Sequence, residues 1–421
     1  MKKIIIILVM FFTVNASAQW VVQTSGTTSD FNDLKFINRY TGWACGSGGK
    51  ILKTTNGGIN WVNIPNPSIN GGGNLSSIFP ADSLYCYVSG GYNIILKTTN
   101  GGSNWIEISN GPLLTGSYNG VHFINRDTGW FCRGGGFVLR TTNGGISFDT
   151  AQAPSFCNDI YFRNFNDGLY CTGGRVFKTT NSGMNWFNTN VPANYAYEFT
   201  KLSVVNNQYV YVVAGDGPLY RSTNFGTTWQ VLDSIKSYPP SVMYCCAFSS
   251  INTGWAGGSY GYLYKTTNGG LNFYRQNTGT DQRFWGSIYS FNDTVVWGVG
   301  GAGKIMHTTT GGQWLVGISN NGSEVPKGFN LYQNFPNPFN PSTKIKFDVA
   351  SSPLIPLQRG TIVVLKVYDM LGREVQTLVN ESLKPGTYEV TFDGSSLNTS
   401  VYFYKLITGD YTNTKRMLLI K

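Results

Sequence analysis

Short stretches in which apolar and polar residues alternate follow one another along most of the chain, a pattern that indicates β-strands. Four such stretches form the first unit, at residues 31–36, 42–45, 51–54 and 61–64. The stretch that begins a unit returns at residues 121–124, 160–162, 202–205, 247–248 and 288–291. Segments with a helical period are scarce, so the sequence predicts an all-β protein built from four-stranded units.

One nine-residue segment, here called the nonamer, marks the turn before the last strand of a unit. It reads Lys-Thr-Thr-Asn-Gly-Gly-Ile-Asn-Trp at residues 53–61, where Asn and Gly favour a tight turn. Further copies, the last of them shortened, begin at Lys97, Arg140, Lys178, Arg221, Lys265 and His307. A period of roughly 40 residues with seven copies predicts a seven-bladed β-propeller. We expect the aromatic residue of each nonamer to lie between neighbouring blades.

The ends of the repeat region suggest how the ring closes. Residues 20–23 (Trp-Val-Val-Gln) read like the last strand of a unit, although no nonamer precedes them. The copy at residues 307–314 has lost a turn residue and its Asn. We therefore predict that residues 20–23 pair with the last blade and cover its edge. The alternative is that residues 314–319 fill this place.

The chain begins with the features of a secretory signal peptide. Residues 1–3 are basic, residues 4–14 form an apolar run too short to span a bilayer comfortably, and residues 16–18 (Ala-Ser-Ala) form a cleavage site. We expect residues 1–18 to be removed and the protein to be exported and soluble, with no transmembrane segment.

Composition agrees with an exported all-β protein. Of 421 residues 52 are Gly, 15% are aromatic and only 12% are charged. The net charge of +10 is less informative, because positive residues of the signal peptide and of the nonamers supply much of it. The rest are spread thinly, so the sequence shows no footprint of nucleic-acid binding.

The seven cysteines do not suggest a disulfide framework. Cys45, Cys132 and Cys171 occupy the same place in one repeated strand, where a later unit has Gly257. This pattern indicates a small buried residue rather than half of a disulfide, and Cys157 has no obvious partner. With no Cys-x-x-Cys pair and only two His, we expect no metal site and no cofactor.

The repeat stops after propeller residues 19–319, at a polar linker of residues 320–326. Residues 327–421 alternate again, for example at residues 344–347, between clusters of turn residues. Prolines within residues 335–341 exclude a central strand there. This pattern predicts a small antiparallel β-sandwich, which could also serve as a stalk or an adhesion module.

The propeller region resembles two known families. The copy of the nonamer at residues 222–229 (Ser-Thr-Asn-Phe-Gly-Thr-Thr-Trp) is the one most similar to the Asp-box of sialidase-type propellers, with Asn where Asp is usual. That resemblance implies a structural hairpin. The wider repeat, F-x-N-x-x-x-G-W-x-x-G-x-x-G-x-I-x-K-T-T-N-G-G-x-x-W, resembles the propeller of photosystem II assembly factors over residues 19–319.

The tail closely resembles the type A C-terminal sorting domain of the type IX secretion system. Residues 331–343 (Leu-Tyr-Gln-Asn-Phe-Pro-Asn-Pro-Phe-Asn-Pro-Ser-Thr), 369–375 (Asp-Met-Leu-Gly-Arg-Glu-Val) and 401–406 (Val-Tyr-Phe-Tyr-Lys-Leu) carry the resemblance. Residues 399–401 (Thr-Ser-Val) depart from the usual Ser-Gly-Val. The resemblance implies that residues 327–421 engage the type IX machinery, which leaves the protein secreted or on the outer cell surface. The tail would then be removed or attached to lipopolysaccharide.

The acids of the propeller give little support for catalysis. A glycosidase needs two carboxyl groups that face the scissile bond. Glu107 lies on an outer strand, and Asp33 and Asp159 match one another in the repeat, which indicates a structural role. The unmatched acids in loops are Glu198, Asp216, Asp233 and Asp281. We therefore expect no catalytic residues and no enzyme; the alternative is an Asp-box-type glycoside hydrolase or lyase that acts on extracellular polysaccharide.

Binding is better supported than catalysis, because the units differ from one another in the loops that a propeller exposes. If the nonamers point to one face, the connections between blades and the turns after the second strand lie on the opposite face. The candidate ligand-binding residues there are Arg133, Arg175, Tyr195, Tyr197, Asp216, Tyr260 and Trp285. Aromatic side chains with charged neighbours suit a glycan or an extended peptide, although core packing also explains each aromatic residue alone. The sequence therefore predicts a non-catalytic binding or scaffolding protein.

Overall fold

The computed structural model describes residues 20–65, 73–108, 116–192, 198–215, 217–234, 242–276, 278, 285–312, 319–320, 326–350, 361–383, 385–394, 397–409 and 411–421. They fall into two compact units, Trp20–Leu315 and Val316–Lys421. The predicted signal peptide lies outside the described residues. Within these ranges, no helix is both long enough and apolar enough to cross a membrane.

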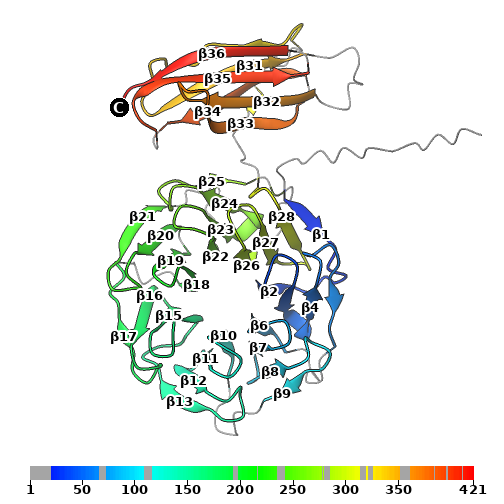
Figure 1. The fold of residues 1–421 in the computed structure, drawn as a ribbon, viewed down its shortest axis with the longest axis vertical. Coiled ribbons are helices and arrows are strands. Elements are labelled where there is room, and N and C mark those ends of the chain that lie inside the picture. The colour runs from blue at the N-terminus through cyan, green and yellow to red at the C-terminus, as the bar shows by residue number, and fades with distance from the viewer. Residues whose placement is uncertain are drawn as a thin grey trace, which may run out of the picture. The chain divides into compact units, whose positions relative to one another are not determined.

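The first unit is a ring of seven four-stranded antiparallel sheets, so the predicted seven-bladed propeller is confirmed (Figure 1). Blade 1 contains β2 (Phe31–Phe36), β3 (Gly42–Gly46), β4 (Ile51–Thr54) and β5 (Val62–Asn63). Blade 2 contains β6 (Leu75–Pro80), β7 (Cys86–Gly90), β8 (Ile95–Thr98) and β9 (Ile106–Glu107). Blade 3 contains β10 (Tyr118–Phe123), β11 (Gly129–Arg133), β12 (Phe137–Thr141) and β13 (Asp149–Gln152). The first strand of each of these blades lies nearest the axis (Figure 1).

The remaining blades repeat this order. Blade 4 contains β14 (Asp159–Phe162), β15 (Gly168–Thr172), β16 (Arg175–Thr179) and β17 (Phe187–Asn188). Blade 5 contains β18 (Phe199–Val205), β19 (Tyr209–Ala214), β20 (Pro218–Ser222) and β21 (Gln230–Ser234). Blade 6 contains β22 (Met243–Phe248), β23 (Gly254–Gly258), β24 (Leu263–Thr266) and β25 (Tyr274–Arg275). Blade 7 contains β26 (Trp285–Ser290), β27 (Val296–Gly300), β28 (Ile305–Thr308) and β1 (Val21–Gln23). Two 3-10 turns, η1 (Ser47–Gly49) and η2 (Ser259–Gly261), follow the second strands of blades 1 and 6.

The first strand of the chain closes the ring. β1 pairs antiparallel with β28, with Val22 opposite Met306, so residues 20–23 complete the last blade as predicted. Blade 7 also contacts blade 1 directly, because the indole Nε1 of Trp297 donates to the carbonyl oxygen of Gly57 at 3.0 Å. Because β1 covers the edge of β28, the backbone groups of β28 are not left open to pair with another chain.

Each nonamer is a turn that a side-chain hydroxyl holds together. In the first copy, Oγ1 of Thr54 accepts the N–H of Gly58 at 2.8 Å, and Oδ1 of Asn56 accepts the N–H of Asn60 at 2.9 Å. Both bonds recur in the copies that contain Thr98, Thr141, Thr179, Ser222 and Thr266. Gly58 has a φ of 90°, which a residue with a Cβ rarely adopts.

Aromatic residues of the second strands lie between neighbouring blades. Trp297 of blade 7 stacks on Phe36 of blade 1, with ring centroids 3.8 Å apart. The same contact recurs as Tyr87 on Phe123, Trp130 on Phe162 and Tyr211 on Phe248. The nonamer residue Trp61 meets Phe36 edge-on, with centroids 6.0 Å apart, and belongs to the same apolar cluster. The sequence therefore located the nonamer ring correctly but missed the second-strand ring that packs deeper.

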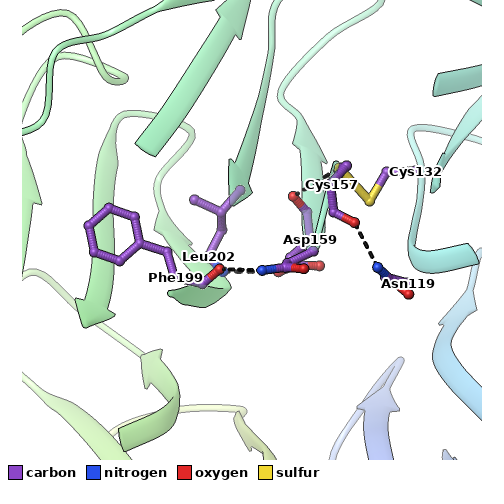
Figure 2. Close-up of a disulfide and its surroundings, with 7 residues drawn as sticks. Asn119, Cys132, Cys157, Asp159, Phe199 and Leu202 are labelled. Carbon is purple, nitrogen blue, oxygen red and sulfur yellow. Dashed lines mark hydrogen bonds between the residues drawn. A yellow bond between two sulfur atoms is a disulfide. The ribbon is translucent and has the colours of Figure 1, made fainter. Parts of the chain in front are cut away.

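Cys132 and Cys157 form a disulfide, so the prediction that Cys132 is only a small buried residue is wrong (Figure 2). Cys132 lies on β11 of blade 3 and Cys157 lies just before β14 of blade 4, with their Cα atoms 5.5 Å apart. Ring packing brings a second strand against the start of the next inner strand, and no sequence spacing reveals that contact. Cys45 and Cys171, at the same repeat position as Cys132, are buried free thiols as predicted.

The second unit is a β-sandwich of two antiparallel sheets, as predicted. One sheet contains β29 (Ser319–Asn320), β34 (Gly386–Asp393), β31 (Ser342–Val349) and β30 (Asn330–Leu331), and the other contains β33 (Glu374–Leu383), β32 (Thr361–Tyr368), β35 (Ser400–Thr408) and β36 (Tyr411–Leu419). Their facing side chains form one core, with Ile345 and Phe347 from one sheet and Val363 and Leu365 from the other. Because β29 pairs with β34, residues 319 and 320 belong to this unit rather than to the propeller or the linker.

The nonamer hydrogen bonds generate a stability prediction. Replacing Thr54 with Val keeps the shape of the side chain but leaves the buried N–H of Gly58 without its acceptor, which costs about 1–3 kcal/mol. Thr55, the next residue, is exposed, so Thr55→Val is a matched control with an expected effect within about 0.5 kcal/mol. Urea denaturation of both variants measures the difference. Equal losses would show that the hydroxyl bond does not hold the turn.

Candidate ligand-binding site

The two ends of each blade carry different kinds of turn. In blade 1, the N–H of Gly57 donates to the carbonyl of Tyr40 at 2.8 Å, so the nonamer lies beside the turn between the first and second strands. At the other end, the N–H of Ser47 donates to the carbonyl of Asp30 at 2.8 Å, beside the segment that enters the blade. We call these ends the nonamer face and the connection face. Of the ligand-binding residues predicted from the sequence, Arg133, Arg175, Tyr260 and Trp285 are described and belong to the connection face.

The structure distributes these predicted residues differently. Tyr260 is 56% exposed in η2, and Arg175 is exposed at the start of β16. Arg133 is only 5% exposed, and its guanidinium carbon lies 5.8 Å from the centroid of the Phe137 ring, so it offers no exposed cation. Tyr195, Tyr197 and Asp216 lie outside the described residues, and only the backbone of Trp285 is described.

A cavity of about 740 Å³ lies on the connection face at blades 2 and 3. The entries to both blades and the turn at residues 91–93 line it with Asn74, Ser76, Gly91, Tyr92, Asn93, Gly116, Ser117 and Asn119. Tyr92 is 85% exposed and has a φ of 55°, so the turn holds a large aromatic side chain out in solvent. The sequence pointed to this face, but it did not single out this pair of blades.

Backbone hydrogen bonds fix the shape of this connection-face cavity. The N–H of Gly91 donates to the carbonyl of Asn74, and the N–H of Asn93 donates to the carbonyl of Gly116, both at 2.8 Å. Nδ2 of Asn119 donates to the carbonyl of Cys157 at 3.0 Å (Figure 2). By contrast, Oδ1 of Asn93 is buried and accepts no hydrogen bond from the described residues. The cavity therefore combines a fixed polar frame with one acceptor that a ligand could satisfy.

A second cavity, of about 380 Å³, lies on the axis of the ring, and residues of all seven inner strands line it. The same position of each inner strand contributes Lys35, Phe79, His122, Tyr161, Ser203, Ala247 and Tyr289. The cavity extends to Asn206 and Ser249, in turns that follow inner strands and therefore belong to the nonamer face. We call it the axial cavity.

A buried ion pair joins several blades beside the axial cavity. Asp33 is fully buried, accepts hydrogen bonds from the hydroxyls of Ser77 at 2.9 Å and Ser287 at 2.8 Å, and lies 3.5 Å from Nζ of Lys201. Burial opposes ionisation of Asp33, but the Lys201 ammonium holds the pKa of Asp33 below its ordinary value. Burial likewise opposes the charge of Lys201, but Asp33 and then Asp159 raise its pKa. Asp33 therefore links blades 1, 2, 5 and 7.

Asp159 lies on the wall of the axial cavity with its carboxylate already in use. Oδ2 accepts the backbone N–H of Leu202 in blade 5 at 2.9 Å. Burial raises the pKa of Asp159, and the charge of Lys201 partly offsets this effect. The bonds of Asp33 and Asp159 cross from one blade to another, which agrees with the structural role expected for these two matched acids.

His122 supplies a neutral ring to the axial cavity. Burial and then the charge of Lys35 lower the pKa of His122 to about 3, so its imidazole carries no charge at pH 7. The ring centroid of Phe79 lies 4.8 Å from that of His122, and the centroid of Tyr161 lies 4.5 Å away on the neighbouring blade. These three rings form a continuous aromatic wall.

The sequence analysis missed the axial cavity because it searched the loops. The available signal was one column of the aligned repeats, in which Lys35 and His122 replace the apolar or small residues of the other inner strands. Among the described residues, no group of three or more His, Cys, Asp or Glu could hold a metal ion.

The fold defines a seven-bladed β-propeller joined to a separate β-sandwich. Residues 12–172 match the family model described as photosynthesis system II assembly factor YCF48, and residues 333–421 match the secretion system C-terminal sorting domain. Residues 12–172 are therefore similar to YCF48 assembly factors and residues 333–421 to secretion sorting domains, so the resemblances to photosystem II assembly factors and to a C-terminal sorting domain are confirmed. The sorting domain supports export by the type IX secretion system to the cell surface or the medium.

Solved structures share the propeller fold at low sequence identity. YCF48 bound to D1 peptide is 18% identical with a TM-score of 0.59, and the match covers 69% of this chain and 97% of that chain. YCF48 from Cyanidioschyzon merolae is 17% identical with a TM-score of 0.59, covering 69% and 99%. An ancestral GH74 enzyme is 13% identical with a TM-score of 0.54, covering 96% of this chain and 64% of that chain. None of the curated proteins matches the chain.

The lowered pKa of His122 predicts how folding stability depends on pH. Its pKa is about 3 in the fold and roughly 6.5 in the unfolded chain, so the unfolded state binds more protons between these values. Stability is therefore lost as the pH falls from about 6.5 towards 3. We expect His122→Phe to lose less stability than the wild type between pH 7 and pH 4, measured by urea denaturation. The same loss in both proteins would contradict the lowered pKa of His122. His307 is present in both proteins and does not affect the comparison.

The Asp33 ion pair predicts a large effect of removing one partner. Asp33→Ala leaves the ammonium of Lys201 buried without its ion-pair partner and should lower the free energy of unfolding by about 3–5 kcal/mol. Asp127→Ala removes an exposed carboxylate at a turn and should change it by less than about 0.5 kcal/mol. Denaturation of the two variants at pH 7 measures both values. An Asp33→Ala variant as stable as Asp127→Ala would disprove the link between blades.

Proposed function

We propose that this chain is an exported, non-catalytic binding protein that holds an extended polypeptide on the connection face of its propeller. The observation that carries the proposal is the connection-face cavity, in which Tyr92 is exposed beside the unpartnered Oδ1 of Asn93. A peptide N–H is the donor that this oxygen lacks, and the Tyr92 ring can cover an apolar side chain.

The chemistry of the lining favours a polypeptide. Its side chains are amides, hydroxyls and one phenol, without a charged residue among those that line the cavity. Side-chain amides both donate and accept, as a peptide backbone does, so the two can pair without a net charge on either partner. One protein with the same fold is YCF48 bound to D1 peptide, a likeness that makes polypeptides the first class to test.

The carboxylates support a role without catalysis. Neither Asp nor Glu is among the residues that line the connection-face cavity. Glycosidases of both types place two carboxyl groups roughly 5 to 9.5 Å apart across the scissile bond. Asp33 and Asp159 are instead committed to bonds between blades. Glu198 is exposed and is the loop acid to test for the alternative, an Asp-box-type glycoside hydrolase or lyase.

The two units then have separate roles, export and ligand binding. We propose that the signal peptide and the sorting domain bring the propeller to the cell surface or the medium, where the connection face meets its ligand. The propeller needs no cofactor for this role, and the sorting domain serves transport rather than recognition of the ligand.

A binding screen with matched variants tests the proposed function. The full-length protein is presented with a display library of random linear peptides and with a panel of cell-wall and extracellular polysaccharides. We expect peptides to be retained, and we expect Tyr92→Ala to weaken the best of them at least tenfold, about 1.4 kcal/mol. Tyr40→Ala is the control, because Tyr40 is 55% exposed on the nonamer face and should not affect retention.

Two results would overturn the proposed function. Retention of polysaccharides without peptides would reject the polypeptide ligand. Turnover of a polysaccharide that Glu198→Gln abolishes would reject the non-catalytic role and favour the glycoside hydrolase.

A further inference from the structure

The axial cavity has a chemistry that the proposed polypeptide site does not use. Its volume of about 380 Å³ lies within the range of small-molecule sites. It reaches the nonamer face at Asn206 and Ser249, whereas the connection-face cavity lies at the opposite ends of the strands. The two cavities share no lining residue, so the axial cavity can be considered, and tested, independently.

The hydrogen bonds around the axial cavity leave one charged group without a partner. Asp33 has its hydroxyl donors and its ion pair with Lys201, and Asp159 accepts the backbone N–H of Leu202. Lys35 also lines the cavity, yet its ammonium makes no hydrogen bond and no ion pair with any described residue. Its charge favours the ionised forms of Asp33 and Asp159 without forming an ion pair with either. The cavity therefore has its acceptors satisfied and one cation available.

The walls beside this cation are flat and apolar. Phe79, His122 and Tyr161 form the aromatic wall, and Tyr289 adds a further ring from blade 7. Ala247 fills the equivalent position in blade 6 with a single methyl group, the smallest side chain at that position of the inner strands. Aromatic walls of this kind bind a planar ring by stacking or by edge contacts.

We propose that the axial cavity binds a small organic anion with a planar apolar body, such as an aryl carboxylate, with its carboxylate on the ammonium of Lys35 and its ring against Phe79 and Tyr161. One ammonium matches one negative charge, whereas a phosphate recruits several donors at once. The neutral His122 adds ring surface without a second cation. This ligand enters from the nonamer face and does not depend on the polypeptide proposed for the other face.

Calorimetric titration of the full-length protein with 4-hydroxybenzoate tests this site. The wild type is expected to bind it with a measurable enthalpy. Acetate, which has the charge without the ring, and 4-hydroxybenzyl alcohol, which has the ring without the charge, should each bind at least tenfold more weakly. The absence of 4-hydroxybenzoate binding, or equal affinity for the neutral alcohol, would overturn the proposal.

Paired variants locate the binding in the cavity. Lys35→Met should lower the affinity for 4-hydroxybenzoate at least tenfold, whereas Lys50→Met, the same change outside the axial lining, should leave it unchanged. Ala247→Phe keeps Lys35 but fills the cavity with a ring, so it should also abolish binding. Phe79 shows that the inner strand accepts Phe at this repeat position. This second variant tests the site if Lys35→Met does not fold. Unchanged affinity in a folded Lys35→Met or Ala247→Phe protein would overturn the proposal, and Tyr92→Ala should not affect this ligand.

Discussion

The ring depends on a stacking contact between the second strand of one blade and the inner strand of the next. Trp297 on Phe36 closes the circle with the same geometry that joins the other aromatic pairs. The contact also dictates the Gly that begins a second strand, because a Cβ at Gly42 would lie 2.5 Å from the ring of Phe36. Gly129, Gly168 and Gly254 meet the same limit. These stacks join blades 7 and 1, 2 and 3, 3 and 4, and 5 and 6, and each contributes about 0.5–1.5 kcal/mol beyond the apolar area it buries.

Features that repeat were predictable, because repetition itself identifies them. The nonamer fixed the number of blades, and the strand-like residues 20–23 revealed how the ring closes. The disulfide between Cys132 and Cys157 was not predictable, since these residues meet only through the packing of two blades. The burial of Arg133 was hidden for the same reason. A turn position reads as exposed in the sequence, but its neighbours decide which way the side chain folds.

The candidate site was half visible from the sequence. The nonamers and the connections lie at opposite ends of the blades, as inferred from the sequence, and Tyr260 and Arg175 are exposed at the connection face. The axial cavity escaped because each inner strand looks like ordinary core when it is examined alone. Only the ring brings Lys35 and His122 to one axis. The blades share one backbone geometry but carry different residues at this position. A repeat protein can therefore build an asymmetric site from symmetric parts.

The ion pair between Asp33 and Lys201 explains how one ring can support two different cavities. It ties four inner strands together, and the connection-face and axial cavities are formed at opposite ends of such strands. Strands held in this way resist independent shifts, which restrains the backbone at both of their ends. A fixed site loses little conformational entropy on binding, which favours affinity from few contacts.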